Sequence, residues 1–449
     1  MAKNLTEGTP WKLIALFALP IMAGNFLQQL YNTADSVIVG NLISQHALSA
    51  VGTCAPLTML FTALAIGFST GAGIIVAQYY GAKQYDDMRR AASTAILFVL
   101  GLGLALSVVG FAAARPLLEH VLGVPAENGV LDMAASYFRL YAVGLMFQFG
   151  YNIFAAILRS IGDSRATLYF LLVSSVLNVG LDLLFVAVFR WGVAGAAIAT
   201  TIAQLGSCLA GYLYMTKKYA LFRFTRAQFR FHGDKCRLIL SVGVPTALQQ
   251  CVVSCGHILV QRLVNSYGGD MIAAFTASQR IEQYILVPII SYQNGISMYV
   301  GQNTGAGKPE RVRTGFRQTA LLSLLTCFVL AGAAFIFTPQ LIRIFGVTGQ
   351  AYDYGCEYLR SMAPCFLVFA VYLVVLGTLQ GAGDVRVAMF CTMLALTVRV
   401  ILSYALAYGT PLSYRAIWWS MVIGWVVAAV VAFWRYFSGR WMEKAVVKG

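Results

Sequence analysis

The sequence predicts an all-α polytopic membrane protein with twelve transmembrane helices in two six-helix lobes. The first observation is composition: hydrophobic residues make up 59% and charged residues 11% of the 449 residues, with a mean hydropathy of +0.73. A soluble domain carries about 25% charged residues. The other two observations are a series of long apolar runs and an internal repeat.

The apolar runs set the number of helices. A helix needs about 20 apolar residues to cross a bilayer. We identify twelve such runs, near residues 13–33, 48–78, 91–113, 133–156, 166–188, 193–215, 237–264, 271–303, 315–337, 357–379, 388–408 and 415–437. The second and eighth runs exceed one crossing, so we expect their ends to project from the membrane or their helices to tilt.

Three matched anchors show that the chain is a duplication. The sequence VAQYYGA at 76–82 ends the second run, and VGQNTGA at 300–306 ends the eighth. Pro20 matches Pro245, and GDSR at 162–165 matches GDVR at 383–386. Each repeat holds an even number of spans, so both enter the membrane from the same side. We expect a pseudo-twofold axis along the membrane normal, lobes at 1–215 and 237–449, and a linker at 216–236.

The basic residues predict the orientation. Lys and Arg concentrate in every second connection and at both ends of the chain, which is the positive-inside pattern with both termini in the cytoplasm. The net charge of +15 is therefore explained by orientation in the plasma membrane, and we expect no nucleic-acid partner. The first run is too long and too polar for a signal peptide, so we expect a retained helix.

Three acidic residues lie inside apolar runs: Asp35, Asp182 and Glu282. A carboxylate at bilayer depth costs about 2.5–3.5 kcal/mol on insertion scales and usually marks a functional site. Asp182 follows Asn178 by four residues, which places both on one helix face. With Asp35 they are expected to form a cluster that takes up a proton or holds Na⁺, since two close carboxylates cannot both stay charged cheaply. The alternative is a static hydrogen-bonded pair.

Two polar stripes predict a cavity. The first comprises Asn25, Gln28, Gln29, Asn32 and Asp35, and the second comprises Gln250, Ser254, His257 and Gln261. Lipid cannot satisfy these groups, so we expect them to line a wet substrate cavity between the halves. Interhelical hydrogen bonding is the alternative.

The second half lacks the carboxylate cluster. Val260 stands where Asp35 is matched, and Arg399 and Ser403 stand where Asn178 and Asp182 are matched. The charged residues within its spans are Arg280, Glu282 and Arg399, and we add them to the cavity candidates. Residues 280 and 282 lie about 200° apart on a helix, so Glu282 is expected to pair with Arg399, either as a structural ion pair or in a functional role.

The set of motifs resembles the multidrug and toxic compound extrusion (MATE) transporters, closest to the DinF-like branch. The resemblance spans nearly the whole chain and rests on Pro20, Asn25 and the sequences DSVIVG at 35–40, GFSTG at 67–71, QYYGA at 78–82, RSIGD at 159–163 and NVGLD at 178–182. It implies export of organic, cationic compounds in exchange for H⁺ or Na⁺, with Asp35, Asn178 and Asp182 as the coupling residues. The acidic residues that the other branch uses in spans 7 and 10 have no counterpart within those spans.

Rival functions are a lipid-linked precursor flippase, favoured by Arg280 and Arg399, a membrane enzyme and an ATP-driven pump. We find no metal-ligand spacing, nucleophile motif or nucleotide-binding loop, so we expect no enzyme and no cofactor besides the coupling ion. The expected partners are a small organic substrate and the bilayer, and we expect a monomer. Pro20 and Pro245 each remove a helix hydrogen bond. We expect a hinge at these prolines, with rigid rocking of the lobes as the equal alternative.

Overall fold

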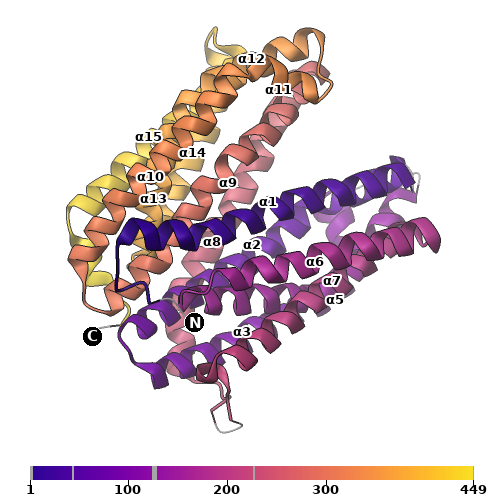
Figure 1. Cartoon of the computed structure of the whole chain (residues 1–449). Helices are drawn as coiled ribbons and strands as arrows, with labels where there is room; N and C mark the ends of the chain where they lie inside the picture. The colour runs from indigo at the N-terminus through magenta and orange to yellow at the C-terminus, as the bar shows by residue number, and fades with distance from the viewer. Residues whose placement is uncertain (1–3, 43–44, 124–128, 226–227, 448–449) are drawn as a thin grey trace. The chain divides into compact units, whose positions relative to one another are not determined.

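The computed structural model describes residues 4–42, 45–123, 129–225 and 228–447, and the side chains of residues 32–50 lie outside that description. Regular structure in the described residues is helical throughout (Figure 1). Eleven helical stretches are long and apolar enough to cross a membrane. The twelfth predicted span, 271–303, is a 37-residue helix made less apolar by residues such as Gln293 and Asn294, yet about 55 Å long. The predicted all-α membrane fold is confirmed.

The helices follow one another in two matching series. The first comprises α1 (Pro10–Leu42), α2 (Gln45–Gly81), α3 (Tyr85–Ala112), α4 (Ala114–Pro116), η1 (Leu117–Val121), α5 (Val130–Ser160), α6 (Arg165–Asp182), η3 (Leu183–Val188), α7 (Gly192–Lys218) and η4 (Ala220–Phe222). The second comprises α8 (Gly233–Asn265), α9 (Gly269–Gly305), α10 (Pro309–Ile336), α11 (Thr338–Ile344), α12 (Gly349–Met362), η5 (Ala363–Cys365), α13 (Phe366–Gly381), α14 (Val385–Gly409), η6 (Ser413–Arg415), α15 (Ala416–Phe437) and η7 (Arg440–Lys444).

Helix lengths and turns repeat between the two series. Helices α1 and α8 have 33 residues each, α2 and α9 have 37, and α3 and α10 have 28. The GD turns also match, because Gly162 has φ 88° and Gly383 has φ 94°. A left-handed backbone of this kind favours glycine. The duplication seen in the sequence therefore extends to the backbone.

The described chain divides into two compact units, and the division runs through two helices. The first unit comprises residues 1–3 and 23–247, and the second comprises 4–22 and 248–449. The boundaries lie between Met22 and Ala23 in α1 and between Ala247 and Leu248 in α8, just beyond Pro20 and Pro245. Both helices continue through their prolines. The predicted bounds of lobes and linker stay a prediction.

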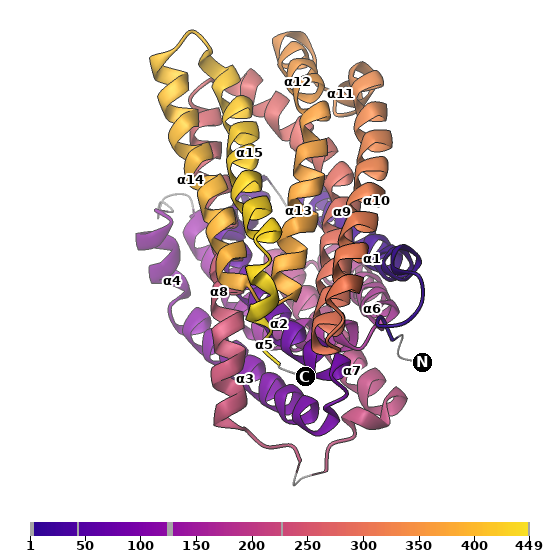
Figure 2. The same cartoon turned by 90° about the vertical axis from the view of Figure 1, so that its left-hand side faces the viewer.

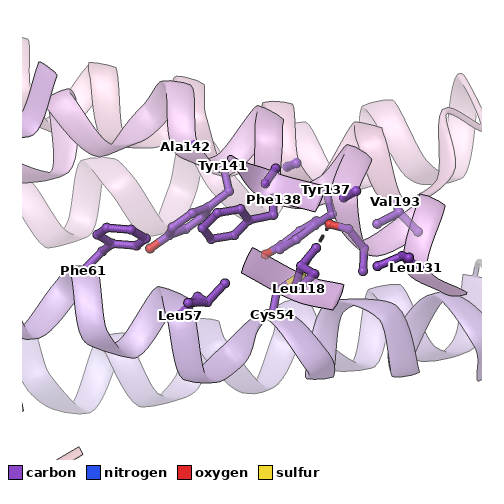
Figure 3. Packing of buried hydrophobic residues seen from close by; sticks show 14 of the residues in the cluster. Cys54, Leu57, Phe61, Leu118, Leu131, Tyr137, Phe138, Tyr141, Ala142 and Val193 are labelled. Carbon is purple, nitrogen blue, oxygen red and sulfur yellow. Dashed lines mark hydrogen bonds between the residues drawn. The ribbon is translucent and has the colours of Figure 1, made fainter. Parts of the chain in front are cut away.

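The core of the first unit is built by α2 and α5 (Figure 3). Cys54, Leu57 and Phe61 of α2 pack with Tyr137 and Phe138 of α5 among fully or nearly buried neighbours. The Phe61 and Phe138 rings stack with centroids 6.0 Å apart. Such interlocking holds α2 and α5 in fixed register.

The second unit depends on very close helix packing between α9 and α13. A Cβ atom at Gly381 of α13 would lie 2.2 Å from the carbonyl oxygen of Ser297 on α9, and one at Gly377 would lie 2.6 Å from the carbonyl oxygen of Gln293. Only glycine allows these backbones to approach so closely. Helices α14 and α15 run side by side in both views (Figures 1 and 2), and they carry Arg399 and Trp418, respectively.

The predicted linker is attached to the first unit. Arg89 Nε donates to the carbonyl oxygen of Leu221 at 2.9 Å, Ser93 Oγ donates to that of Arg230 at 3.1 Å, and the backbone N–H of His232 donates to Thr94 Oγ1 at 3.1 Å. The described part of the connection thus lies along α3.

Candidate functional site

The first candidate site lies where α6 packs against α7 in the first unit. Asn178 and Asp182 of α6 are 2% and 0% exposed. Their four-residue spacing puts them on the same face of the helix, and that face is turned inward. Asn178 Nδ2 donates to Thr200 Oγ1 of α7 at 3.4 Å, and Thr200 Oγ1 donates to the Ala196 carbonyl at 3.0 Å.

Oxygen atoms dominate this interface. Asn178 Oδ1 and Ser175 Oγ are buried and have no hydrogen-bond partner among the described residues. Asp182 adds a fully buried carboxylate. A group of hard oxygen donors is the type of environment that accepts a proton or a hard cation. The arrangement is therefore chemically suited to proton uptake or Na⁺ binding.

The side chain of Asp35 lies outside the described residues, as does that of Asn32. Their predicted places in the coupling cluster and the cavity stay predictions. In the part of the chain that is described, no group of three or more His, Cys, Asp or Glu side chains is positioned to hold a metal ion.

Two polar residues of α7 were missed by sequence reasoning: Thr200 at this interface and Gln204, whose Oε1 lies beside Gly144 of α5. They lie four residues apart on α7 and so share a face. That spacing was the available signal. A lone Thr or Gln in an apolar helix is also common at ordinary helix contacts, which is why the signal is weak.

The other stripe residues are placed on α1 and α8. Asn25 is half-buried and Gln28 exposed on α1, whereas Gln250, Ser254 and Gln261 are half-buried and His257 exposed on α8. Ser254 Oγ donates to the Gln250 carbonyl at 3.2 Å. Gln261 Nε2 donates to Asn265 Oδ1 at 2.9 Å. These two side chains are thus hydrogen-bonded within their own helix.

A chain of buried amides crosses the second unit, and the sequence had not indicated it. Gln249 Nε2 donates to Thr392 Oγ1 at 2.7 Å, and Gln380 Nε2 donates to Gln249 Oε1 at 2.8 Å. Gln293 Nε2 extends the chain to Gln380 Oε1 at 3.5 Å. The amides join α8, α9, α13 and α14. Because their donors and acceptors are paired with one another, the chain has the character of a structural network.

The three charged candidates of the second unit differ in burial. Glu282 of α9 and Arg399 of α14 are 9% and 6% exposed, whereas Arg280 is exposed. Glu282 Oε2 accepts a hydrogen bond from the Tyr358 hydroxyl of α12 at 2.7 Å. Arg399 interacts electrostatically with both, although no ion pair within 4.0 Å joins these two described residues, Glu282 and Arg399.

The repeated GD turns carry a matched pair of buried carboxylates. Asp163 Oδ2 accepts hydrogen bonds from Tyr214 at 2.9 Å, Lys218 at 3.0 Å and Tyr219 at 2.6 Å. Burial acts to raise the pKa of Asp163, but these hydrogen bonds and the Lys218 charge hold the pKa below its ordinary value. The same carboxylate raises the pKa of Tyr219, in addition to burial.

In the second repeat the matched carboxylate has one strong partner. Asp384 Oδ2 accepts from Arg435 Nε at 2.6 Å, and the two side chains are 5% and 12% exposed. Arg435 lies at the position that Tyr214 takes in the first repeat. Both turns therefore tie the fifth span of a repeat to its sixth, through different chemistry.

Comparison with known proteins identifies the family. The MatE family model matches residues 20–184 and 245–405. The chain is 29% identical over 441 residues to the "Probable multidrug resistance protein YpnP" of Bacillus subtilis, with 98% of both chains covered. A "Crystal structure of MATE in the bent conformation" matches at TM-score 0.90 and 25% identity, covering 99% of this chain and 98% of that one. A structure in "the straight conformation" matches at 0.90 and 26%, covering 98% of each. The predicted family is confirmed: the chain belongs to the MATE family of multi-pass membrane transporters.

Proposed function

We propose that the chain is an antiporter that exports drugs or other organic, mostly cationic, compounds by alternating access, driven by inward H⁺ or Na⁺. The observation that carries the proposal is the fully buried Asp182 beside Asn178 in a membrane transporter. A buried carboxylate is costly in a membrane unless protonation or ion binding is part of its work. A relative named as a multidrug resistance protein supports the substrate class.

We propose that Asp35, Asn178 and Asp182 are the coupling residues. In this mechanism the carboxylates stop interacting with the substrate when they take up a proton or Na⁺. They return to the ion-free state when the proton or Na⁺ leaves on the other side of the membrane. One inward H⁺ carries about 2.3 kcal/mol per 100 mV, equivalent to about a 50-fold concentration ratio for a neutral substrate. A cationic substrate exchanged for one H⁺ gains nothing from the voltage and depends on the pH gradient or a second ion.

We propose a hinge at Pro20 and Pro245. The division into compact units supports it, because each helix passes from one unit to the other just beyond its proline. The related transporter structures in bent and straight conformations are compatible with it. Spectroscopic distances along α1 in inward-facing and outward-facing states test the hinge, and an unchanged distance across Pro20 decides for rigid rocking.

The remaining parts of the proposal concern setting and substrate path. The substrate cavity is lined by polar residues of α1 and α8 with Glu282, Arg280 and Arg399. The chain belongs to the DinF-like branch of the family. It acts as a monomer in the plasma membrane, with both termini in the cytoplasm. A test of orientation is labelling of single cysteines near each terminus in everted and right-side-out vesicles.

The decisive experiment uses purified protein in liposomes with pH and Na⁺ gradients imposed separately. We expect Asp35→Asn to abolish substrate accumulation while the protein stays folded and substrate binding survives with less pH dependence, since Asn keeps the shape but cannot titrate. Asn178→Ala should weaken transport less, because it removes an orienting group. A protein lacking both carboxylates that builds a wild-type gradient contradicts the proposal.

A lipid-linked precursor flippase remains the second candidate because Arg399 is buried in the second unit. A cationic cavity suits a phosphate-bearing lipid. Transfer of a fluorescent lipid diphosphate across the liposome bilayer, without drug transport, decides for this alternative.

A further inference from the structure

Arg399 is buried, and one of its hydrogen-bond donors lacks an acceptor. Its side chain is 6% exposed, and its buried Nε has no hydrogen-bond partner among the described residues. A guanidinium carries five N–H donors, and a buried donor left unpaired costs about 1–3 kcal/mol, more when it is charged. This position therefore lacks an acceptor.

The groups around Arg399 come from several helices of the second unit. Glu282 of α9 and Tyr358 of α12 interact with it electrostatically, and so does His257 of α8. Helices α14 and α15 pack closely beside the arginine, because residue 424 of α15 is a glycine whose added Cβ would lie 2.5 Å from the carbonyl oxygen of Ala395 and 3.5 Å from the Cβ atom of Arg399. Glu282, the acidic group that interacts with Arg399, is already hydrogen-bonded to Tyr358.

A second donor in the same cluster is also unpaired. The indole Nε1 of Trp418 is buried and has no partner among the described residues. The Trp418 ring packs edge-on against Tyr358, with centroids 5.3 Å apart. The cluster thus contains two buried N–H groups that lack acceptors, one of them cationic. A bound anion is the ligand that supplies what both are missing.

We propose that Arg399, assisted by Trp418, forms a binding site in the second unit for a single carboxylate or halide anion. A carboxylate suits the planar guanidinium because it can accept two parallel hydrogen bonds. Glu282 repels the incoming anion and so limits the site to one negative charge. Where the carboxylate belongs to a transported compound, the inference rests on the proposed function. Where it is a free anion, it does not.

The test compares two dyes that differ in one group. Rhodamine 110 carries a free carboxylate, and rhodamine 123 is its methyl ester. Their binding to purified full-length protein in detergent is measured by fluorescence anisotropy, without any ion gradient. We expect Arg399→Gln to weaken binding of the acid about 10-fold or more relative to binding of the ester, because a charge-assisted hydrogen bond contributes about 1.5–3 kcal/mol.

Two further variants sharpen the result. Glu282→Gln removes the repelling charge, so we expect it to tighten binding of the acid relative to binding of the ester. Arg360→Gln is the matched control, because Arg360 is an exposed arginine on α12, two residues beyond Tyr358. It removes the same charge outside the cluster and should change neither dye. Equal losses for both dyes in Arg399→Gln, or no loss in either, overturn the proposal.

Competition with free anions distinguishes the two possible sources of the ligand, a carboxylate of a transported compound and a free anion. Benzoate should displace the acid dye from the wild-type protein, and chloride at equal concentration reveals whether a halide competes as well. If neither dye binds, a rise in melting temperature with benzoate or chloride in the wild type, absent in Arg399→Gln, supports the anion site while the drug-export proposal fails. If that variant does not fold, the wild-type competition and Glu282→Gln decide, and no effect in both overturns the site.

Discussion

The two units share a backbone plan but bury different polar groups, since the second unit buries the carboxylate of Glu282 together with a cation. The first unit buries an oxygen-rich interface at Asn178 and Asp182, and the second buries a cation at Arg399. Helix lengths and GD turns are nevertheless matched between the repeats. The comparison teaches that helix packing constrains the duplicated backbone, whereas the buried polar positions have diverged in charge and chemistry.

The difference between the two units is tested most directly by neutralising one buried carboxylate in each, Asp182 in the first unit and Glu282 in the second. We expect Asp182→Asn to reduce gradient-driven export about 100-fold or more, which corresponds to about 2.7 kcal/mol. Glu282→Gln should leave substantial export, because the proposed coupling residues all lie in the first unit. Uptake into liposomes under matched gradients measures both. Loss of export in Glu282→Gln alone would move coupling to the second unit.

The matched GD carboxylates should differ in their contribution to stability. Asp384→Asn leaves the buried Arg435 without its partner, and breaking a buried ion pair costs about 3–5 kcal/mol. Asp163→Asn keeps hydrogen-bonding groups beside Lys218, which is 38% exposed, and should cost about 1–3 kcal/mol. Thermal unfolding in detergent at pH 7 measures the difference, and equal losses would contradict it.

The Asp163 contribution also has a defined pH dependence. Because the folded-state pKa of Asp163 is lowered, its stabilising effect is fully present above the ordinary Asp pKa of about 3.9 and is lost as the pH falls through the folded-state value. The difference in melting temperature between wild type and Asp163→Asn should therefore shrink below about pH 4. A constant difference from pH 7 to pH 3 would show that the charge is not the cause.

Substitutions at matched helix-packing positions of the two units should change stability by an intermediate amount. Gly381 of the second unit corresponds to Ser160 of the first. Gly381→Ala places a Cβ 2.2 Å from a carbonyl oxygen and should destabilise the protein by about 1–3 kcal/mol. Ser160→Ala should cost less than about 1 kcal/mol, since it loses a hydrogen bond to its own helix. Gly332→Ala, with no atom within 4 Å, should be stabilising. Melting temperatures rank the three.

Solvent-exposed ion pairs should contribute equally little to stability in the two units. Arg115–Asp132 in the first unit and Arg313–Glu310 in the second are largely solvent-exposed. Asp132→Asn and Glu310→Gln should each change the free energy of unfolding by less than about 0.5 kcal/mol. A larger change in thermal unfolding for either variant would mean that the pair is shielded in the membrane-bound protein.

Much of the fold could be predicted because the bilayer imposes a strong pattern. A span of apolar residues must be helical, so all twelve predicted runs fall on helices, and the four-residue spacing placed Asn178 and Asp182 together on one buried face. The short helices α4 and α11 carry no such pattern and were not predicted.

The rest of the site depends on contacts between helices. Gln249 lies one residue before the predicted polar stripe, and only the packing of α8 against α13 and α14 assigns it to the amide chain. The absence of an acceptor at Arg399 likewise follows from its neighbours and not from its spacing to Glu282. Sequence periodicity identifies a face of a helix but not the side chain that meets it.

The placement of the unit boundaries inside α1 and α8 implies that neither six-helix repeat is self-sufficient. Residues 4–22 of the first repeat belong to the second unit, and the start of α8 through Ala247 belongs to the first. A gene cut between the repeats should therefore yield two fragments that are each degraded alone and rescue one another when made together.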